Sequence, residues 1–241
     1  PPWLLKGGYA LELRLGDTAR ATRDLDLGVP HPNRLAPGGE GVGAAIREAL
    51  ADAAERDLGD WFEFAVGPAT ADLDGPPGGG ARYPIDCRVD GRIFAQFHVD
   101  VGLGDRVAGE PEWLEGHDFL AFAGIPPARL VVLPPAQHFA EKIHAYTFPW
   151  RDRPNTRVRD LVDLVLLLDT GALDLAATAA ALRLTFAQRA THALPRALPA
   201  PPEAWAAPFA ALAGEVALQE RTADAAFARV AAFYAALPLD G

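Results

Sequence analysis

The chain has 241 residues and is 50% hydrophobic, so it can bury a sizeable core as one large domain or two small ones. Its single cysteine, Cys87, excludes a disulfide framework and a cysteine-based zinc site. It lacks an apolar run near the roughly 18 residues of a membrane span, and its first residues lack the basic-then-apolar pattern of an export signal. The sequence therefore predicts a cytoplasmic protein with no membrane partner. Because the chain has no Met and begins at Pro1, we expect further residues to precede it.

The net charge of −10 argues against attraction of a phosphate backbone by the overall field of the protein. A nucleic-acid partner would need a local basic patch. The candidate patch consists of Arg151, Arg153, Arg157 and Arg159. The alternative is that these arginines belong to a solvated loop and helix start.

The first part of the chain predicts alternating helices and strands. Apolar spacing indicates a helix over Tyr9–Leu15, a strand over Ala21–Leu27, a helix within residues 40–57 and a strand over Trp61–Val66. A loop rich in Pro and Gly, residues 28–39, separates the first strand from the second helix.

The clearest local structure is a β-hairpin. Its arms, Tyr83–Val89 and Arg92–Val101, flank Asp90-Gly91, which is a strong signal for a two-residue turn. Alternation along the second arm predicts which side chains face the core, namely those of Ile93, Ala95, Phe97, Val99 and Val101. The other face then carries His98 and Asp100.

From about residue 134 the chain becomes helical. One helix is expected to follow Pro134-Pro135 and reach Tyr146, and the next to run from an N-cap at Thr156 to Gly171. Further helices are expected near 175–190, 203–219 and 222–237. The sequence therefore predicts an α+β fold, with an α/β domain over residues 1–130 and a helical domain over residues 131–241.

Three carboxylates are candidates for a metal site. Asp24 and Asp26 lie two apart in an expected strand and so project from the same face, while Leu25 and Leu27 enter the core. Two carboxylates on one face repel each other unless a cation joins them, and Mg²⁺ prefers oxygen ligands. Asp100 would supply the third carboxylate of a two-metal site. The alternative is that Asp24 and Asp26 are surface residues of an edge strand.

Lys6-Gly7-Gly8 precedes the first expected helix. Two glycines let a backbone approach a ligand closely, and the free N–H groups of a helix start favour phosphate. The alternative is an ordinary glycine turn, since the segment lacks the Gly-Lys-Ser/Thr end of a Walker A loop.

Lysine is rare in this chain. Of 22 basic residues only Lys6 and Lys142 are lysines, which favours positions where a compact ammonium serves better than a guanidinium fork. The alternative for Lys142 is a surface salt bridge with its neighbour Glu141.

Together these segments resemble the nucleotidyltransferase motif of the DNA polymerase β superfamily. That motif has Gly-Gly or Gly-Ser at a helix start, a D-x-D on the next strand and a lone carboxylate on a later strand. More narrowly, residues 4–190 are similar to the AbiEii/AbiGii family of nucleotidyltransferase toxins. The similarity is carried by residues 5–11 (LKGGYAL), 20–27 (RATRDLDL), 140–145 (AEKIHA) and 157–164 (RVRDLVDL).

The resemblance implies a polymerase β-like palm, with a small mixed sheet and helices, followed by a C-terminal helical bundle that contributes Lys142 and Asp160 to the active-site cleft. It implies that Lys6, Gly7 and Gly8 hold the triphosphate of an NTP substrate. It also implies that Mg²⁺ or Mn²⁺ is bound by the three carboxylates Asp24, Asp26 and Asp100.

The later motif residues also gain roles from the resemblance. Lys142 would contact the nucleotide phosphates, and Asp160 would orient or deprotonate the acceptor. Asp160 and Asp163 share a helix face near an N-terminus, and the alternative is that they only favour the helix dipole. Two departures from the family are Arg159, where many relatives have Lys, and Arg23, where relatives often have a small, polar or acidic residue.

The implied reaction transfers a nucleoside monophosphate from an NTP to an acceptor hydroxyl, such as a tRNA 3′ end, and releases pyrophosphate. A toxin–antitoxin system would add a cognate antitoxin encoded nearby. RNA or phosphate contacts are expected from Arg20, Arg23, Arg151, Arg153, Arg157 and Arg159. Two alternatives stay open: transfer to a small molecule or a protein, which the acidic charge favours slightly, and a non-catalytic NTP-binding relative, which the complete motif set disfavours.

Overall fold

The computed structural model describes residues 3–20, 22, 24–36, 41–73, 75–150 and 154–239. The chain divides into two compact units. The sheet unit comprises residues 1–13, 22–106 and 112–132, and the helical unit comprises residues 14–21, 107–111 and 133–241. Two short segments, 14–21 and 107–111, thus belong to the helical unit although they lie in the first half of the chain.

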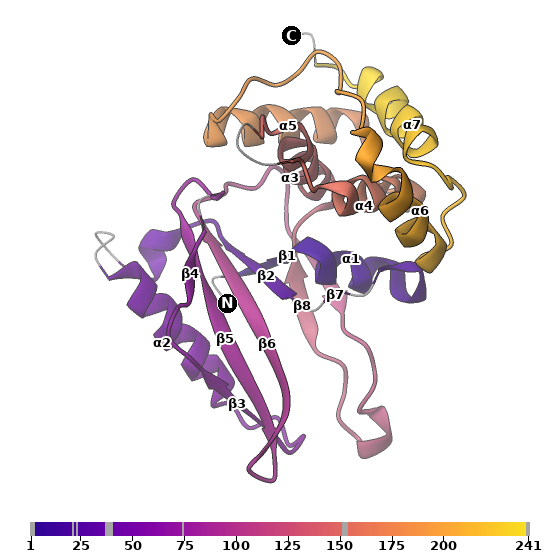
Figure 1. Cartoon of the computed structure of the whole chain (residues 1–241). Helices are drawn as coiled ribbons and strands as arrows, with labels where there is room; N and C mark the ends of the chain where they lie inside the picture. The colour runs from indigo at the N-terminus through magenta and orange to yellow at the C-terminus, as the bar shows by residue number, and fades with distance from the viewer. Residues whose placement is uncertain are drawn as a thin grey trace. The chain divides into compact units, whose positions relative to one another are not determined.

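The sheet unit is built on a mixed sheet with the strand order β3-β5-β6-β2-β1-β8-β7, and β4 pairs with β5 (Figure 1). The strands are β1 Leu4–Lys6, β2 Asp24–Val29, β3 Phe62–Val66, β4 Ala71–Asp72, β5 Gly80–Val89, β6 Arg92–Leu103, β7 Glu112–Glu115 and β8 Arg129–Val132. The pairs β2–β6 and β1–β8 are parallel and the others antiparallel. The expected small mixed sheet is therefore present, with more strands than the sequence predicted.

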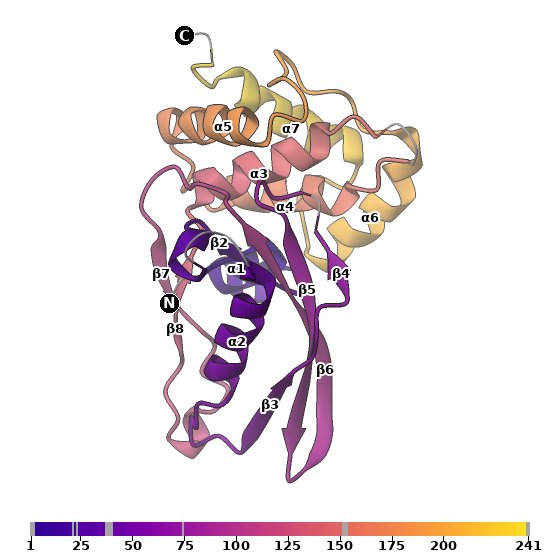
Figure 2. The ribbon, with the colours of Figure 1, turned by 90° about the vertical axis from the view of Figure 1, so that its left-hand side faces the viewer.

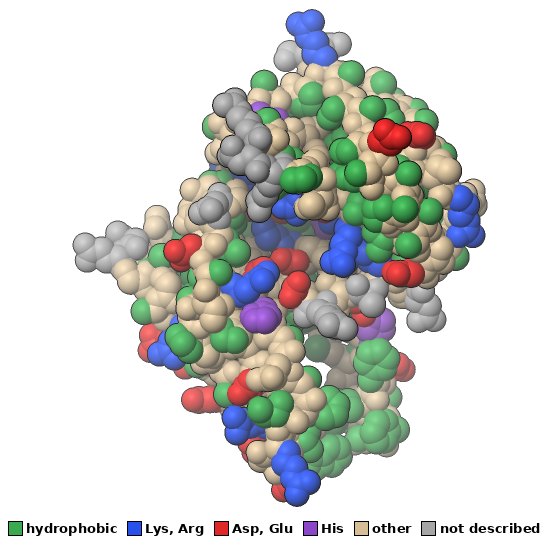
Figure 3. Space-filling view, in the orientation of Figure 1, with side chains coloured by type: hydrophobic (Ala, Val, Ile, Leu, Met, Phe, Trp, Pro, Cys, Tyr) green, Lys and Arg blue, Asp and Glu red, His purple; other side chains and the backbone are tan. Residues whose placement is uncertain are grey.

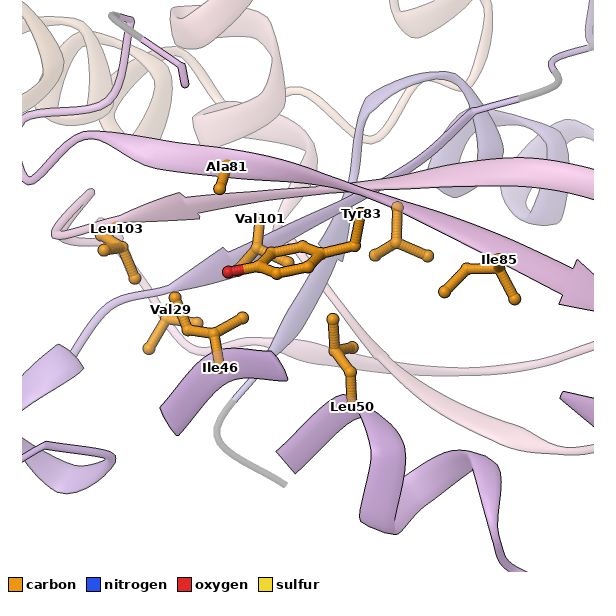
Figure 4. Close-up of a cluster of buried hydrophobic side chains, with 9 residues drawn as sticks. Val29, Ile46, Leu50, Ala81, Tyr83, Ile85, Val101 and Leu103 are labelled. Atoms are coloured by element: carbon orange, nitrogen blue, oxygen red, sulfur yellow. The ribbon is translucent and has the colours of Figure 1, made fainter. Parts of the chain in front are cut away.

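Helices α1 (Gly7–Leu15) and α2 (Val42–Ala54) supply apolar side chains to one face of the sheet. Ile46 and Leu50 of α2 pack against core side chains of β2, β5 and β6, as Figure 4 shows. Figure 2 shows α2 alongside the strands. The Tyr83 hydroxyl, buried in this core, donates a hydrogen bond to the Gly43 carbonyl at 3.1 Å.

Ala10 of α1 packs in a second cluster with Leu5 and Val132. Leu25 and Leu27 contact both clusters, as predicted. Because side chains alternate along a strand, the aspartates of β2 are left on the opposite face.

The predicted hairpin is present, but its tip departs from simple alternation. Val99 and Val101 are buried as expected, whereas Ile93 is 55% exposed and Phe94 is 69% exposed. The expectation that Ile93 faces the core was wrong, because a β-bulge shifts the register between β5 and β6 beside Cys87 and Arg88. A bulge adds one residue to one strand, so the alternation beyond it no longer matches the core.

The helical unit contains α3 Pro135–Thr147, α4 Val158–Asp169, α5 Leu175–Arg189, α6 Ala206–Glu215 and α7 Ala223–Ala235. Short 3₁₀ turns elsewhere span Gly16–Thr18, Pro32–Arg34, Ala121–Ala123 and Glu203–Trp205. Most residues of α3 and α4 are buried, so these two helices form the interior of the unit. Among the helices that the structure describes, none is both long and apolar enough to cross a membrane.

The predicted N-cap of α4 was wrong. Arg157 occupies that position, without a side-chain cap. The side chain of Asn155 instead accepts a hydrogen bond from the backbone N–H of Arg157 at 3.0 Å. This Asn turn satisfies a backbone donor before the helix begins and makes a Thr156 cap unnecessary.

Candidate active site

A row of four charged residues crosses the sheet on the face opposite α2. Lys6 on β1 pairs with Asp26 on β2, Asp26 with Asp100 on β6, and Asp100 with Arg82 on β5. Directly opposed residues on neighbouring strands project to the same side. The two carboxylates therefore lie next to each other in the middle of the row, with a cation at each end. This set is called the charged row below.

Asp24 lies on the same face, two residues before Asp26, and pairs with His98 of β6. Both Asp24 and His98 are exposed. Figure 3 shows acidic, basic and histidine side chains gathered on this face of the sheet. Within the described part of the chain, no three His, Cys, Asp or Glu side chains are grouped closely enough to hold a metal ion as they stand.

Asp100 is held by Arg82 through two hydrogen bonds. Arg82 Nε donates to Oδ1 at 2.7 Å, and Nη2 donates to Oδ2 at 2.7 Å. The pKa of Arg82 is raised above its ordinary value by its hydrogen bond to Asp100 and by the charge of Asp100, with smaller contributions from Asp24 and Asp26. The guanidinium therefore interacts with all three predicted metal ligands.

Lys6 forms a salt bridge across the sheet face. Its Nζ lies 3.2 Å from Asp105 Oδ2, and both side chains are largely buried. A Cβ atom at Gly28 would come within 3.6 Å of Lys6 Cδ, and one at Gly102 within 3.5 Å of Lys6 Nζ. These two glycines oppose each other in the sheet, so together they leave room for the lysine side chain.

Gly7 joins β1 to α1 in a conformation that few other residues adopt. Its φ is +65°, and a Cβ atom there would lie 1.8 Å from Asp26 Oδ2. Glycine thus allows the first turn of α1 to lie directly against an aspartate of the charged row. The free N–H groups of a helix start are therefore close to a predicted metal ligand.

The helical unit contains a separate ion network centred on Lys142. Its Nζ donates to Asp160 Oδ1 at 3.0 Å and to Asp163 Oδ2 at 2.6 Å. Arg20 binds the same Asp163 with two hydrogen bonds, at 2.8 and 2.9 Å. Asp163 is fully buried, so its charge is balanced inside the protein by a lysine and an arginine.

Burial and ion pairing shift the pKa values of Lys142 and Asp163 in opposite directions. Burial alone lowers the pKa of Lys142, but the charges of Asp163 and Asp160 outweigh it and hold that pKa above its ordinary value. Burial raises the pKa of Asp163, but Lys142 and Arg20 outweigh it and hold that pKa below its ordinary value. The lysine and Asp163 therefore both stay charged at neutral pH.

Lys142 does not form the surface salt bridge with Glu141 that was the alternative expectation. Glu141 pairs with Arg189 at 3.5 Å, while Lys142 turns to α4. Asp160 Oδ2 accepts no hydrogen bond among the described residues and lies 3.7 Å from Arg157 Nη1. This second carboxylate oxygen is thus the less engaged of the two.

The predicted phosphate-binding arginines differ in their surroundings. Arg20 donates two hydrogen bonds to buried Asp163, so its guanidinium is held within the helical unit. Arg157 is partly exposed and lies over the Trp150 ring at 5.5 Å, and Arg159 is exposed. The remaining candidates lie outside the described residues; they are Arg23, Arg151 and Arg153.

Two charged residues of these sites, Arg82 and Asp105, were missed at the level of sequence. Arg82 was missed because the bulge hides its pairing with Asp100. Asp105 follows the end of β6, and its contact with Lys6 spans 99 residues of sequence. Asp163 was noticed for its spacing from Asp160, but its partner Arg20 is 143 residues away.

A family model described as nucleotidyl transferase AbiEii toxin, type IV toxin–antitoxin system, matches residues 1–232. The chain belongs to the AbiEii family of nucleotidyltransferase toxins. It is therefore a transferase that uses an NTP, as the motifs around Asp24–Asp26 and Lys142 predicted.

Among solved structures, the chain is similar to MenT4, a nucleotidyltransferase toxin from Mycobacterium tuberculosis. The TM-score is 0.53 at 20% identity, over 96% of this chain and 79% of that one. This likeness shows the fold, which is the predicted polymerase β-like nucleotidyltransferase fold. The antibiotic-resistance factor ANT(2″)-Ia also matches, at 17% identity over 78% of this chain and 80% of that one. Its TM-score of 0.34 is too low to show a common fold. No curated protein sequence matches the chain.

Replacing Gly7 with alanine should disturb Asp26 as well as the backbone. Gly41→Ala is a matched control, because its φ is +69° and a Cβ there meets nothing within 4 Å. We expect Gly41→Ala to lower the free energy of unfolding by about 1–2 kcal/mol and Gly7→Ala by about 3 kcal/mol or more. Urea unfolding measures both. Equal losses would show that Gly7 is not pressed against Asp26.

Replacing Asp163 with asparagine should destabilise the helical unit strongly, because Lys142 and Arg20 would lose a buried counter-charge. We expect a loss of about 3–5 kcal/mol in the free energy of unfolding. Asp169→Asn is the control on the same helix, since Asp169 pairs with Arg229 near the surface, and it should cost about 0–1 kcal/mol. A loss at Asp163 as small as that at Asp169 would contradict the network.

Proposed function

We propose that this protein transfers a nucleoside monophosphate from a metal-bound NTP to the 3′-terminal hydroxyl of a tRNA, and releases pyrophosphate. One observation carries the proposal most directly. Asp26 and Asp100 lie opposite each other on neighbouring strands, and the Gly7 start of α1 lies against Asp26. A carboxylate pair beside free helix N–H groups suits a cation together with a phosphate chain.

The residues present fit a divalent cation such as Mg²⁺ or Mn²⁺. Its ligands would be carboxylate oxygens of Asp24, Asp26 and Asp100, which share one face of the sheet. The guanidinium of Arg82, attracted by the same three charges, indicates that this face favours a cation. When bound, the metal would neutralise charge on the phosphate oxygens and on the attacking and leaving oxygens.

The other residues of the sheet unit would bind and orient the nucleotide. Backbone N–H groups at Gly7 and Gly8 are the proposed donors to phosphate oxygens, because N–H groups in the first turn of a helix have no acceptor within the helix. Lys6 would add a positive charge at the end of the charged row. The acceptor oxygen would then bond to the α-phosphorus as the bond to the β-phosphate oxygen breaks.

In the helical unit we propose two further roles, which rest on the family motif. The Lys142 ammonium would contact nucleotide phosphates, with Asp163 and Arg20 fixing its position. Asp160 Oδ2, which accepts no hydrogen bond among the described residues, would accept one from the acceptor hydroxyl and take its proton. Exposed Arg157 and Arg159 are proposed RNA contacts. A cognate antitoxin encoded nearby and a cytoplasmic location complete the proposal.

A second candidate keeps the reaction and changes the acceptor to a small molecule or a protein hydroxyl. The net charge of −10 favours it, because an acidic chain repels the phosphate backbone of an RNA at long range. The proposed RNA acceptor therefore depends on local arginines rather than on the field of the whole protein.

Incubation with each α-labelled NTP, Mg²⁺ and bulk RNA tests the proposal. We expect label on RNA of tRNA size, because the acceptor is the tRNA 3′ end. Asp26→Asn should reduce labelling at least about a hundredfold, since it removes one charge from the proposed metal ligands. Asp72→Asn, at an exposed position of β4, should leave labelling unchanged.

Periodate-oxidised tRNA is the control for the acceptor, because it lacks a reactive 3′-terminal hydroxyl. It should accept no label. Label on protein, with none on RNA, would replace the tRNA proposal by the second candidate. Absence of transfer to any acceptor, together with absence of NTP binding in Mg²⁺, would contradict the proposed reaction altogether.

A further inference from the structure

Arg82 is an unusual neighbour for a predicted metal ligand. Its planar guanidinium makes two parallel hydrogen bonds at 2.7 Å and so engages both oxygens of Asp100. Charge-assisted bonds of this bidentate kind are among the stronger polar interactions in proteins. A cation that uses Asp100 as a ligand must therefore compete with Arg82.

The position of Arg82 depends on the β-bulge in the hairpin. Beside the Asp90-Gly91 turn, Val89 pairs with Arg92. Continued without a shift, that register would set Arg82 opposite Val99. The shift beside Cys87 and Arg88 sets Arg82 opposite Asp100 instead. The pairing of Arg82 with Asp100 therefore depends on the register shift between β5 and β6.

The surroundings of Arg82 allow it to leave Asp100 at modest cost. Its side chain is 38% exposed, whereas that of Asp100 is 13% exposed. A guanidinium that turns away from the sheet can be hydrated, and an ion pair this exposed contributes far less to stability than a fully buried one. Asp100, in contrast, needs a positive partner because it is more enclosed and lies beside Asp26.

We propose that Arg82 is a positioning residue that acts as a built-in substitute for the divalent cation. It neutralises Asp100 in the metal-free protein and releases that carboxylate when the metal binds with the nucleotide. Metal binding without nucleotide is therefore weakened, which couples the arrival of the metal to that of the NTP. The inference rests on the proposed function, because it assumes that Asp100 is a metal ligand.

Mn²⁺ titration of the nucleotide-free protein, followed by calorimetry and by the electron paramagnetic resonance signal of free Mn²⁺, tests the inference. We expect Arg82→Gln to bind Mn²⁺ about tenfold more tightly than the wild type, because the competing bonds to Asp100 are gone. Arg88→Gln is the matched control: Arg88 lies on the same strand, is 42% exposed and also pairs with an aspartate. It should change the affinity less than twofold.

A thermal melt provides a second measurement. Metal-free Arg82→Gln should melt at a lower temperature than Arg88→Gln, since Asp26 and Asp100 would repel each other without Arg82. Mn²⁺ should raise the melting temperature of Arg82→Gln more than that of the wild type. Arg82→Lys, which keeps the charge but not the fork, should be intermediate in both measurements.

Mn²⁺ affinity that is unchanged or weaker in Arg82→Gln would overturn the inference, as would a gain that persists when Asp100→Asn is added. Failure of the proposed function would give a different result from failure of this inference. If the wild type labels RNA but Arg82→Gln gains no Mn²⁺ affinity, only the role of Arg82 is contradicted. If no acceptor is labelled while Arg82→Gln still binds Mn²⁺ more tightly, the transfer reaction is contradicted and the competition stands.

Discussion

Repulsion between Asp26 and Asp100 is the constraint around which the sheet unit is organised. Two unit charges about 5 Å apart repel by roughly 3 kcal/mol at an effective dielectric constant of 20, and these two carboxylates are direct neighbours on β2 and β6. The structure places compensating charge close by: Arg82 binds Asp100, Lys6 continues the row, and the N-terminal end of α1 lies against Asp26. The same concentration of negative charge suits the cation and the nucleotide of the proposed reaction.

The helical unit also brings two carboxylates close together, but it neutralises them in a different way. Asp160 and Asp163 converge on one ammonium, that of Lys142, and Arg20 supplies a second positive charge to Asp163. Burial makes each of these charges costly unless it is paired. The network therefore fixes Lys142 within the unit more firmly than a surface salt bridge would. The scarcity of lysine in the sequence is consistent with a site where a compact ammonium fits between two carboxylates.

The sequence could predict those features that depend on short-range patterns. Alternation along β2 and β6 placed Asp24, Asp26 and Asp100 on one face, and the Asp90-Gly91 turn located the hairpin. It could not predict Arg82 opposite Asp100, because a bulge of one residue changes the register without a clear local signal. The three-residue β1 and the short β7 and β8 were also missed, since so few residues show no periodicity. Pairings such as Arg20 with Asp163 depend on the packed fold and have no local signature.

Paramagnetic broadening of backbone amide signals by Mn²⁺, in the presence of an NTP, tests most directly whether Asp26 and Asp100 bind the cation. We expect the amides of residues 24–26 and 98–100 to broaden first at substoichiometric Mn²⁺, because these residues surround the paired carboxylates. The same amides should stay sharp in Asp26→Asn. Broadening that begins at another acidic segment, such as β7 with its exposed Glu115, and persists in Asp26→Asn would contradict a metal site on the charged row.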